Sequence, residues 1–147
     1  MALSLTQVNE ELRRYRPKYL GCFAIDQLPK KINQGEGLVS NFERSDQTGS
    51  HWVCCYYFPK KLIYYDSFGF PPPIDILALL KRSADRSFYT LPDFQSYTSD
   101  RCGMFCITFL KSAFDGKDPI EDMKLNFDMH PSHSNEEHVL AVYNALK

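Results

Sequence analysis

The chain has 147 residues, of which 44% are hydrophobic, and its 17 basic and 18 acidic side chains leave a net charge of −1. A chain of this length most often folds as one domain, so we expect a single domain over residues 1–147. The near-zero charge argues against nucleic-acid binding through overall charge. The sequence lacks the roughly 20 consecutive apolar residues of a membrane span and the apolar core of a signal peptide. We therefore expect a soluble, intracellular protein without a membrane contact.

The first half of the chain predicts a helix followed by a hairpin. Ser4 and Gln7 have the spacing of a capping box, and the helix that they open must end before Pro17. Residues 33–50 are polar and contain glycine, and we expect a loop around a short apolar patch. The aromatic-rich runs 51–58 and 62–68 predict a β-hairpin, and its first strand is apolar on both faces, which is typical of the middle of a sheet.

The second half predicts helices around one further strand. A helix begins at Ile74, which we place on its apolar face with Leu77 and Leu80, and residues 87–92 suit a strand. Residues 102–114 are apolar nearly all round, as expected of a helix buried in the core, and a last helix opens at Ser134. Together these elements indicate an α+β protein.

The number and placement of the cysteines argue against a disulfide framework. The chain has five: Cys22, Cys54, Cys55, Cys102 and Cys106. The count is odd, and two of them are neighbours inside an apolar run, which suits buried thiols. Cys102 and Cys106 lie four positions apart and so share one face of the predicted helix. That spacing is compatible with a metal pair, a disulfide, core packing, or a nucleophile at the helix start.

Cys102 stands where a helix would stabilise a thiolate. The N-terminus of a helix offers unpaired N–H groups and the positive end of the dipole, and Ser99 or Asp100 is placed to cap this one. Gly103 removes a side chain beside the thiol, where a substrate backbone would approach. On the helix alone, an ordinary buried thiol is the favoured interpretation, because free cysteine is among the most buried residue types.

Three further side chains favour the nucleophile. His51, at the start of the predicted central strand, is the usual type of base for a thiol. With a two-residue hairpin loop at residues 59–60, Asp66 becomes its diagonal neighbour, placed to accept the Nδ1–H of His51. Gln95 lies seven residues before Cys102 and offers an amide to stabilise an oxyanion.

These residues, with the stretches "YLGCFAIDQLP", "GSHW", "YYDSFGF" and "CGMFC", resemble the adenain family, the adenovirus cysteine proteases. The resemblance spans roughly residues 19–127 and extends, more distantly, to the ubiquitin-like-protein proteases of the Ulp1-like fold. It implies a papain-like or adenain-like cysteine protease fold. In that fold a central mixed β-sheet packs on a buried helix that carries the nucleophile, with further helices at the flanks.

The resemblance also implies roles. Cys102 would be the nucleophile, His51 the general base, Asp66 its orienting acid and Gln95 the oxyanion donor, with Trp52 and, from the sequence argument above, Gly103 assigned to substrate binding. The implied reaction is peptide hydrolysis through a thioester, after small residues such as glycine, in viral or virus-like precursor proteins. The implied localisation is the host nucleus and the virion.

Cofactor expectations follow from where the chain departs from the family. Adenain is activated by a peptide disulfide-linked to a cysteine after an Asp-Arg pair, and here Ser87 follows that pair. We therefore expect no disulfide-linked activator, while a non-covalent peptide activator stays open. Adenain is also longer and basic and uses DNA as a cofactor; for this short, near-neutral chain we expect no DNA activation.

Parts of the sequence are also compatible with other classes of function. Zinc binding would combine Cys102 and Cys106 with His130 and His133, or with His138, but the two cysteines lie in an apolar helix and not in a knuckle. We therefore expect no metal and assign Cys106 to the core. A non-catalytic interaction module would normally have lost one of the four site residues. A deconjugating protease for ubiquitin-like modifiers remains the alternative within the enzyme class.

Overall fold

A computed structural model describes residues 3–42, 51–89, 94–95, 100–127 and 132–145. In that part of the chain the helices and strands follow one another in this order: α1 (Leu5–Leu12), a 3₁₀ turn (Arg13–Tyr15), β1 (Tyr19–Phe23), β2 (Gly37–Asn41), β3 (Trp52–Phe58), β4 (Lys61–Tyr65), α2 (Ile74–Ser83), β5 (Ser87–Tyr89), α3 (Cys102–Phe114), α4 (Pro119–Asn126) and α5 (His133–Ala145). None of the described helices is long and apolar enough to cross a membrane.

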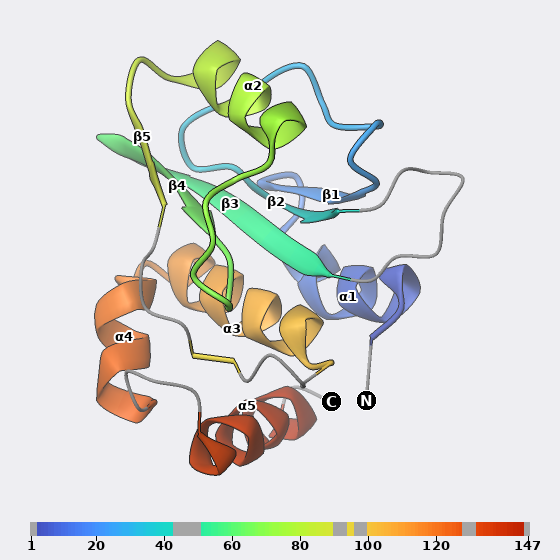
Figure 1. The fold of residues 1–147 in the computed structure, drawn as a ribbon, viewed down its shortest axis with the longest axis vertical. Helices are drawn as coiled ribbons and strands as arrows, with labels where there is room; N and C mark the ends of the chain where they lie inside the picture. Colours follow the sequence, from blue (N-terminus) through green and yellow to red (C-terminus); the bar gives the residue numbers. More distant parts are fainter. Residues whose placement is uncertain (1–2, 43–50, 90–93, 96–99, 128–131, 146–147) are drawn as a thin grey trace.

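The strands form one mixed sheet in the order β1-β2-β3-β4-β5 (Figure 1). β1 is parallel to β2, and β4 is parallel to β5, whereas the β2–β3 and β3–β4 pairs are antiparallel. The predicted α+β class is confirmed, and β3 is the central strand, as its apolar faces indicated.

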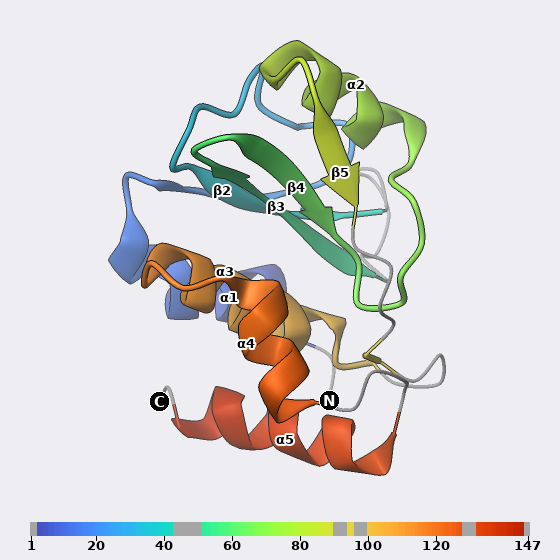
Figure 2. The same ribbon diagram turned by 90° about the vertical axis from the view of Figure 1, so that its left-hand side faces the viewer.

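Helices cover both faces of the sheet. α2 lies on one face, α1 and α3 lie on the other, and α5 packs beyond α3 (Figure 2). Successive residues of β3 alternate between the two cores: Cys54 belongs to the core on the α3 side, and Val53 and Cys55 belong to the core on the α2 side. Because both faces are covered, the strand carries no polar face.

The hairpin has the predicted register. Phe58 pairs with Lys61 across the two-residue turn, and Cys54 pairs with Tyr65 four steps further on. Extending the same register past the last pair brings His51, before β3, and Asp66, after β4, to one end of the sheet. The local rule for a short hairpin therefore positions two of the proposed site residues.

α3 has the predicted bounds and is the buried helix of the fold. The sheet, α1, α4 and α5 all pack against it, and its side chains Phe105 and Phe109 are fully buried. Its N-cap residue is Arg101, without a capping side-chain hydrogen bond, so the expected cap by Asp100 is wrong. The other proposed cap, Ser99, lies outside the described residues.

Two strands and one helix were not predicted. β2 occupies Gly37–Asn41, inside the segment expected to be loop, and β1 precedes it. A Cβ at Gly37 would lie 3.0 Å from the Cys55 carbonyl oxygen, so the glycine that suggested a loop is required by close strand packing. α4 is opened by Asp118, whose carboxylate accepts from the Ile120 and Glu121 backbone N–H groups.

The inward face of α2 differs from the predicted one. Ile74 is 81% exposed, whereas Ile76, Leu79 and Leu80 are buried. The helix begins at Ile74 itself, so its first side chain projects from the first turn beside the proline-rich loop and not onto the sheet.

Candidate active site

Three side chains predicted from the sequence meet at one end of the molecule. His51 directly precedes β3, Asp66 directly follows β4, and Cys102 is the first residue of α3. The Nε2–H of His51 donates to Asp66 Oδ1 at 2.8 Å. The expectation that Nδ1 would face the carboxylate is therefore wrong, because a Cβ spacing constrains the distance between two side chains and not the turn of the ring.

Aromatic neighbours hold the imidazole of His51 in this orientation. The Phe68 ring stacks on it with centroids 4.5 Å apart and an interplanar angle of 13°, and Phe42 meets it edge-on at 4.9 Å. The backbone N–H of Phe68 also donates to Asp66 Oδ1 at 2.8 Å. Phe68 thus orders both the ring and the acid that the ring contacts.

The electrostatics favour a protonated His51. Burial by itself would lower its pKa, but hydrogen bonds to the fully buried Asp66 and to the Cys102 side chain, together with their charges, outweigh burial and raise the pKa to about 9. Because Nε2 is bonded to Asp66, Nδ1 is the ring nitrogen left to interact with Cys102. A buried carboxylate needs such a cationic partner.

The Cys102 thiol interacts with His51 and also accepts a backbone hydrogen bond. The backbone N–H of Trp52 donates to Sγ at 3.2 Å, and the thiol stands at the N-terminus of a 13-residue helix. Both features stabilise negative charge on sulfur. Chemically, the arrangement suits a thiolate nucleophile paired with an imidazolium.

Gly103 and Trp52 pack against the N-terminal segment. A Cβ at Gly103 would lie 3.3 Å from both Leu3 Cβ and Trp52 Cδ1, and the indole N–H of Trp52 donates to the Leu3 carbonyl at 3.1 Å. Trp52 is only 8% exposed. The space beside Gly103 is thus filled by this chain's own residues, and a role of either residue in substrate binding stays a prediction.

Gln95 is tied to the residue that follows Asp66. Its backbone N–H donates to the Ser67 carbonyl at 3.1 Å, and its side-chain Oε1 accepts from the Ser67 hydroxyl. Both side chains are fully buried. Of the contacts that sequence reasoning missed, Ser67 and Phe68 lie inside the quoted stretch "YYDSFGF", whereas Leu3 and Phe42 carry no signal that marks them.

The other thiols are less suited to act as nucleophiles. Cys54, Cys55 and Cys106 are buried, and burial raises the pKa of each. The thiols of Cys54 and Cys106 hydrogen-bond to each other, so the assignment of Cys106 to the core is confirmed. Burial also raises the pKa of Cys22.

The residues named for the zinc alternative do not gather where the structure describes them. His133 is largely exposed and approaches Glu137, and His138 lies edge-on to Phe127. His130 lies outside the described residues. Within the described part of the chain, no group of three or more His, Cys, Asp or Glu is placed to hold a metal ion.

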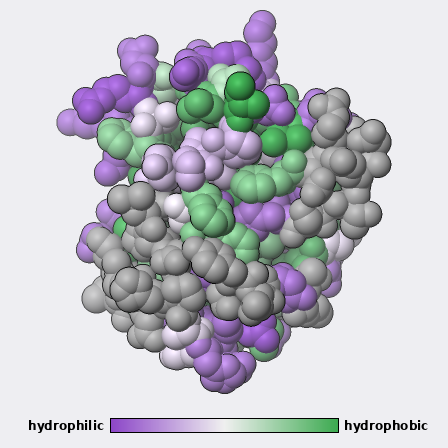
Figure 3. Space-filling model, viewed as in Figure 1, coloured by the Kyte–Doolittle hydropathy of each residue, from purple (hydrophilic) through white to green (hydrophobic). Residues whose placement is uncertain are grey.

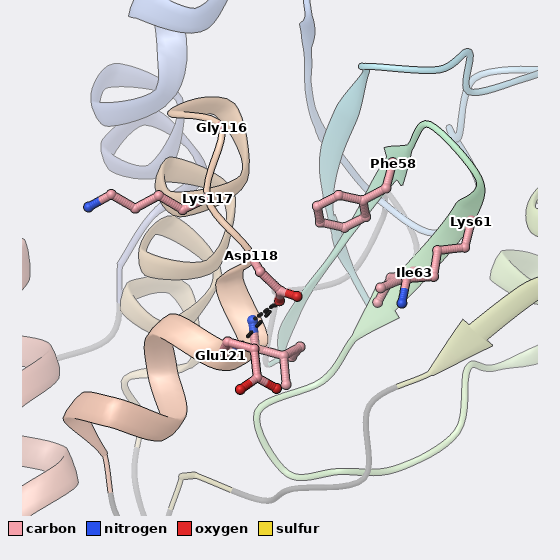
Figure 4. Close-up of a pocket in the computed structure, with 8 residues that line it drawn as sticks. Phe58, Lys61, Ile63, Gly116, Lys117, Asp118 and Glu121 are labelled. Atoms are coloured by element: carbon pink, nitrogen blue, oxygen red, sulfur yellow. Dashed lines mark hydrogen bonds between the residues drawn. The ribbon is translucent and has the colours of Figure 1, made fainter.

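A hollow of about 370 Å³ lies between the hairpin and the start of α4 (Figure 4). It is lined by Phe58 and Lys61 of the hairpin turn and by residues 116–118. These mark the far ends of β3 and α3, whereas His51 and Cys102 stand at the near ends. The hollow is therefore separate from the candidate site.

An apolar surface leads outward from His51. The Phe68 ring lies 6.3 Å from that of Phe70, and Phe70 and Ile74 are 49% and 81% exposed. On this side the candidate site is bordered by the exposed ring of Phe70. Apolar side chains also gather in the upper part of the face shown in Figure 3, where α2 lies.

Comparison with solved structures defines the class of fold. The ASFV pS273R protease superposes with a TM-score of 0.67 at 13% identity, over 99% of this chain and 67% of that one. The Se-Met form of the same protease gives 0.66 at 15% identity over the same shares. The yeast Ulp1 protease domain in complex with Smt3 gives 0.46 at 14% identity, over 99% and 79%, a level that carries no argument.

No family model matches the chain, and no curated protein sequence matches it either. The structural likeness therefore stands alone. It confirms the predicted fold class, because the chain shares the α+β fold of the ASFV pS273R protease. At 13–15% identity the likeness shows the fold and not the activity.

Proposed function

We propose that the protein is a cysteine endopeptidase. The observation that carries the proposal is the grouping of Asp66, His51 and Cys102: Asp66 is hydrogen-bonded to His51, and His51 interacts with Cys102 at a helix start, in a fold shared with a viral protease. A thiol, an imidazole and a carboxylate in that order form the nucleophile, base and orienting group of acyl transfer. Gln95 completes the proposed site as the oxyanion donor.

The first half of the proposed reaction forms a thioester. The Cys102 thiolate attacks the carbonyl carbon of the scissile peptide bond, and the negative charge that develops on oxygen is stabilised by the Cys102 backbone N–H and the Gln95 amide. The C–N bond then breaks as protonated His51 transfers its Nδ1 proton to the leaving amine. Asp66 keeps the ring oriented throughout.

The second half releases the acid. Neutral His51 takes a proton from a water molecule, and the resulting hydroxide attacks the thioester carbonyl. The C–S bond breaks and Cys102 leaves as a thiolate, while the proton stays on His51, which restores the starting ion pair.

Polypeptides are the proposed substrates, cleaved after small residues such as glycine, and we propose viral or virus-like precursor proteins among them. The resemblance to adenain supports this choice, and the apolar surface at Phe68 and Phe70 gives a substrate chain a place to lie. The proposed setting is the host nucleus and the virion. A Ulp1-like role on the tails of ubiquitin-like modifiers is the competing specificity.

We propose activity without a disulfide-linked activator or DNA. Ser87 begins the edge strand β5, and a serine cannot form the disulfide that the adenain activator uses. A non-covalent peptide activator is compatible with the proposal. Adding candidate peptides or DNA to the purified chain tests this point, and a rate that depends on DNA would contradict it.

A peptide library tests the proposed activity and specificity together. The purified chain is incubated with peptides that vary on both sides of the scissile bond, and with a folded ubiquitin-like modifier carrying a C-terminal extension. We expect cleavage after glycine in the peptides and none by Cys102→Ser. Cleavage of the modifier alone would favour the deconjugating role, and no cleavage of either would contradict the proposal.

A further inference from the structure

Ser67 contacts Gln95 from the sheet side. Ser67 follows Asp66 directly, and it binds Gln95 twice, through its carbonyl to the backbone N–H and through its hydroxyl to Oε1. Both side chains are fully buried. A buried hydroxyl is costly unless it is hydrogen-bonded, so this pair is a specific arrangement and not a solvated loop contact.

The same segment is held from the opposite side by α5. Asn135, which is 1% exposed, donates from Nδ2 to the carbonyl of Phe94 at 3.1 Å. In the same turn of α5, the carbonyl of Glu136 accepts from Arg101 Nη1 at 2.6 Å. The first turn of α5 therefore contacts both the residue before Gln95 and the residue before Cys102.

An oxyanion donor is effective only when it is fixed before the charge develops. Glutamine has three side-chain torsions, and holding its amide in one place costs side-chain entropy that buried neighbours must offset. Such a group must be held within about 0.5 Å of its productive position, and a loop achieves this only with support from rigid elements. Here the segment that follows β4 supplies the support through Ser67, and α5 supplies it through Asn135.

We propose that Ser67 and Asn135 are positioning residues that hold Gln95 in place for oxyanion stabilisation. Ser67 fixes the amide itself, and Asn135 fixes the backbone at Phe94 from which the Gln95 side chain projects. The inference rests on the proposed function, because it takes Gln95 as the oxyanion donor. It adds to that function two buried polar residues that do not touch the reacting atoms.

The test compares two reactions of the same thiol. p-Nitrophenyl acetate acylates Cys102 through a tetrahedral oxyanion, whereas iodoacetamide alkylates it without one, and the modification at Cys102 is followed by mass spectrometry in both cases. Losing an oxyanion donor costs about 10²–10³-fold, and we expect misplacing one to cost about tenfold. Ser67→Ala and Asn135→Ala should lower the acylation rate about tenfold and leave the alkylation rate unchanged.

Three further variants sharpen the result. Asn144→Ala, an exposed residue on the same helix, should change neither rate. Asn135→Leu keeps most of the side-chain volume and removes the donor, so it should behave as Asn135→Ala does and avoids the cavity that an alanine leaves. In a Gln95→Ala background, Ser67→Ala and Asn135→Ala should lower acylation no further, because both act through Gln95.

The outcomes separate the inference from the proposed function. The positioning role alone would be overturned by a full additional loss in the Gln95→Ala background. It would also be overturned if Gln95→Ala slowed acylation while Ser67→Ala and Asn135→Leu left it unaffected. Unchanged acylation in Gln95→Ala itself would overturn the oxyanion role in the proposed function, and the inference with it.

Discussion

At the scale of single residues, His51 is the most informative side chain of the protein. Its ring stacks on Phe68 and meets Phe42 edge-on, and it lies between Asp66 and Cys102. The types of side chain around His51 could be predicted, because a thiol nucleophile needs a base and the base needs an orienting partner. Which nitrogen of the His51 ring faces Asp66 could not be predicted, because that depends on the aromatic rings of Phe42 and Phe68, which come from separate segments.

Replacing Asp66 by asparagine should lower the pKa of His51. The carboxylate supplies both a hydrogen bond and a charge that favour the imidazolium, while burial opposes it. In the wild-type protein, NMR should show the His51 ring titrating near pH 9. In Asp66→Asn the titration should move toward lower pH. An unchanged titration would show that the carboxylate does not hold the proton on His51.

The raised pKa of His51 also predicts how stability varies with pH. A group whose pKa rises from 6.5 to about 9 on folding stabilises the folded state fully below pH 6.5. That contribution, of about 3 kcal/mol, is lost as the pH rises through about 9. Urea unfolding should therefore show that, from pH 6 to pH 10, the free energy of unfolding falls more for the wild-type protein than for His51→Gln. Equal losses would contradict the assignment.

At the scale of elements, local patterns predicted the hairpin and α3 correctly. The hairpin follows from two strand-like runs around a short turn, and α3 follows from an apolar run bounded by Gly116, which adopts a φ of +84°. β1 and β2 escaped prediction because their pairing partners, and not their own residues, make them strands. The close contact at Gly37 likewise depends on the partner strand and could not be predicted from the local sequence.

Gly37→Ala should therefore destabilise the sheet. The new methyl group would lie 3.0 Å from the Cys55 carbonyl oxygen and 3.1 Å from Leu110 Cδ2, so either the strands or the α3 contact must shift. Overpacking of this kind costs about 1–3 kcal/mol. Urea unfolding measures it, with Gly116→Ala as the control, because no atom lies within 4 Å of a Cβ there.

The control separates overpacking from backbone strain. Gly116→Ala should cost about 1 kcal/mol, from its left-handed backbone conformation alone. A Gly37→Ala variant that unfolds at the wild-type urea concentration would show that the contact with Cys55 does not constrain the strand.

At the scale of the whole molecule, the fold distinguishes one thiol from the other four. Cys54, Cys55 and Cys106 lie in the two cores beside the sheet, and burial also raises the pKa of Cys22. Cys102 accepts from the Trp52 N–H, interacts with His51 and stands at the helix N-terminus. The five cysteines could be counted from the sequence, but only the packing of sheet and helices separates their environments.

Iodoacetamide at neutral pH should therefore label Cys102 well ahead of the other four cysteines. Peptide mapping after short reaction times measures each site, and His51→Ala should slow the labelling of Cys102 alone. Similar rates at Cys102 and Cys22 would contradict a thiolate–imidazolium pair.

The central claim is that Cys102 is the nucleophile of a cysteine endopeptidase, and the acyl-enzyme tests it most directly. Reactions with a cleavable peptide are quenched in acid during turnover, and the fragment spanning residues 102–111 is sequenced by mass spectrometry, because it contains both Cys102 and Cys106. The account predicts a thioester on Cys102 and no cleavage by Cys102→Ala. Acylation of another residue, or hydrolysis that persists in Cys102→Ala, would contradict it.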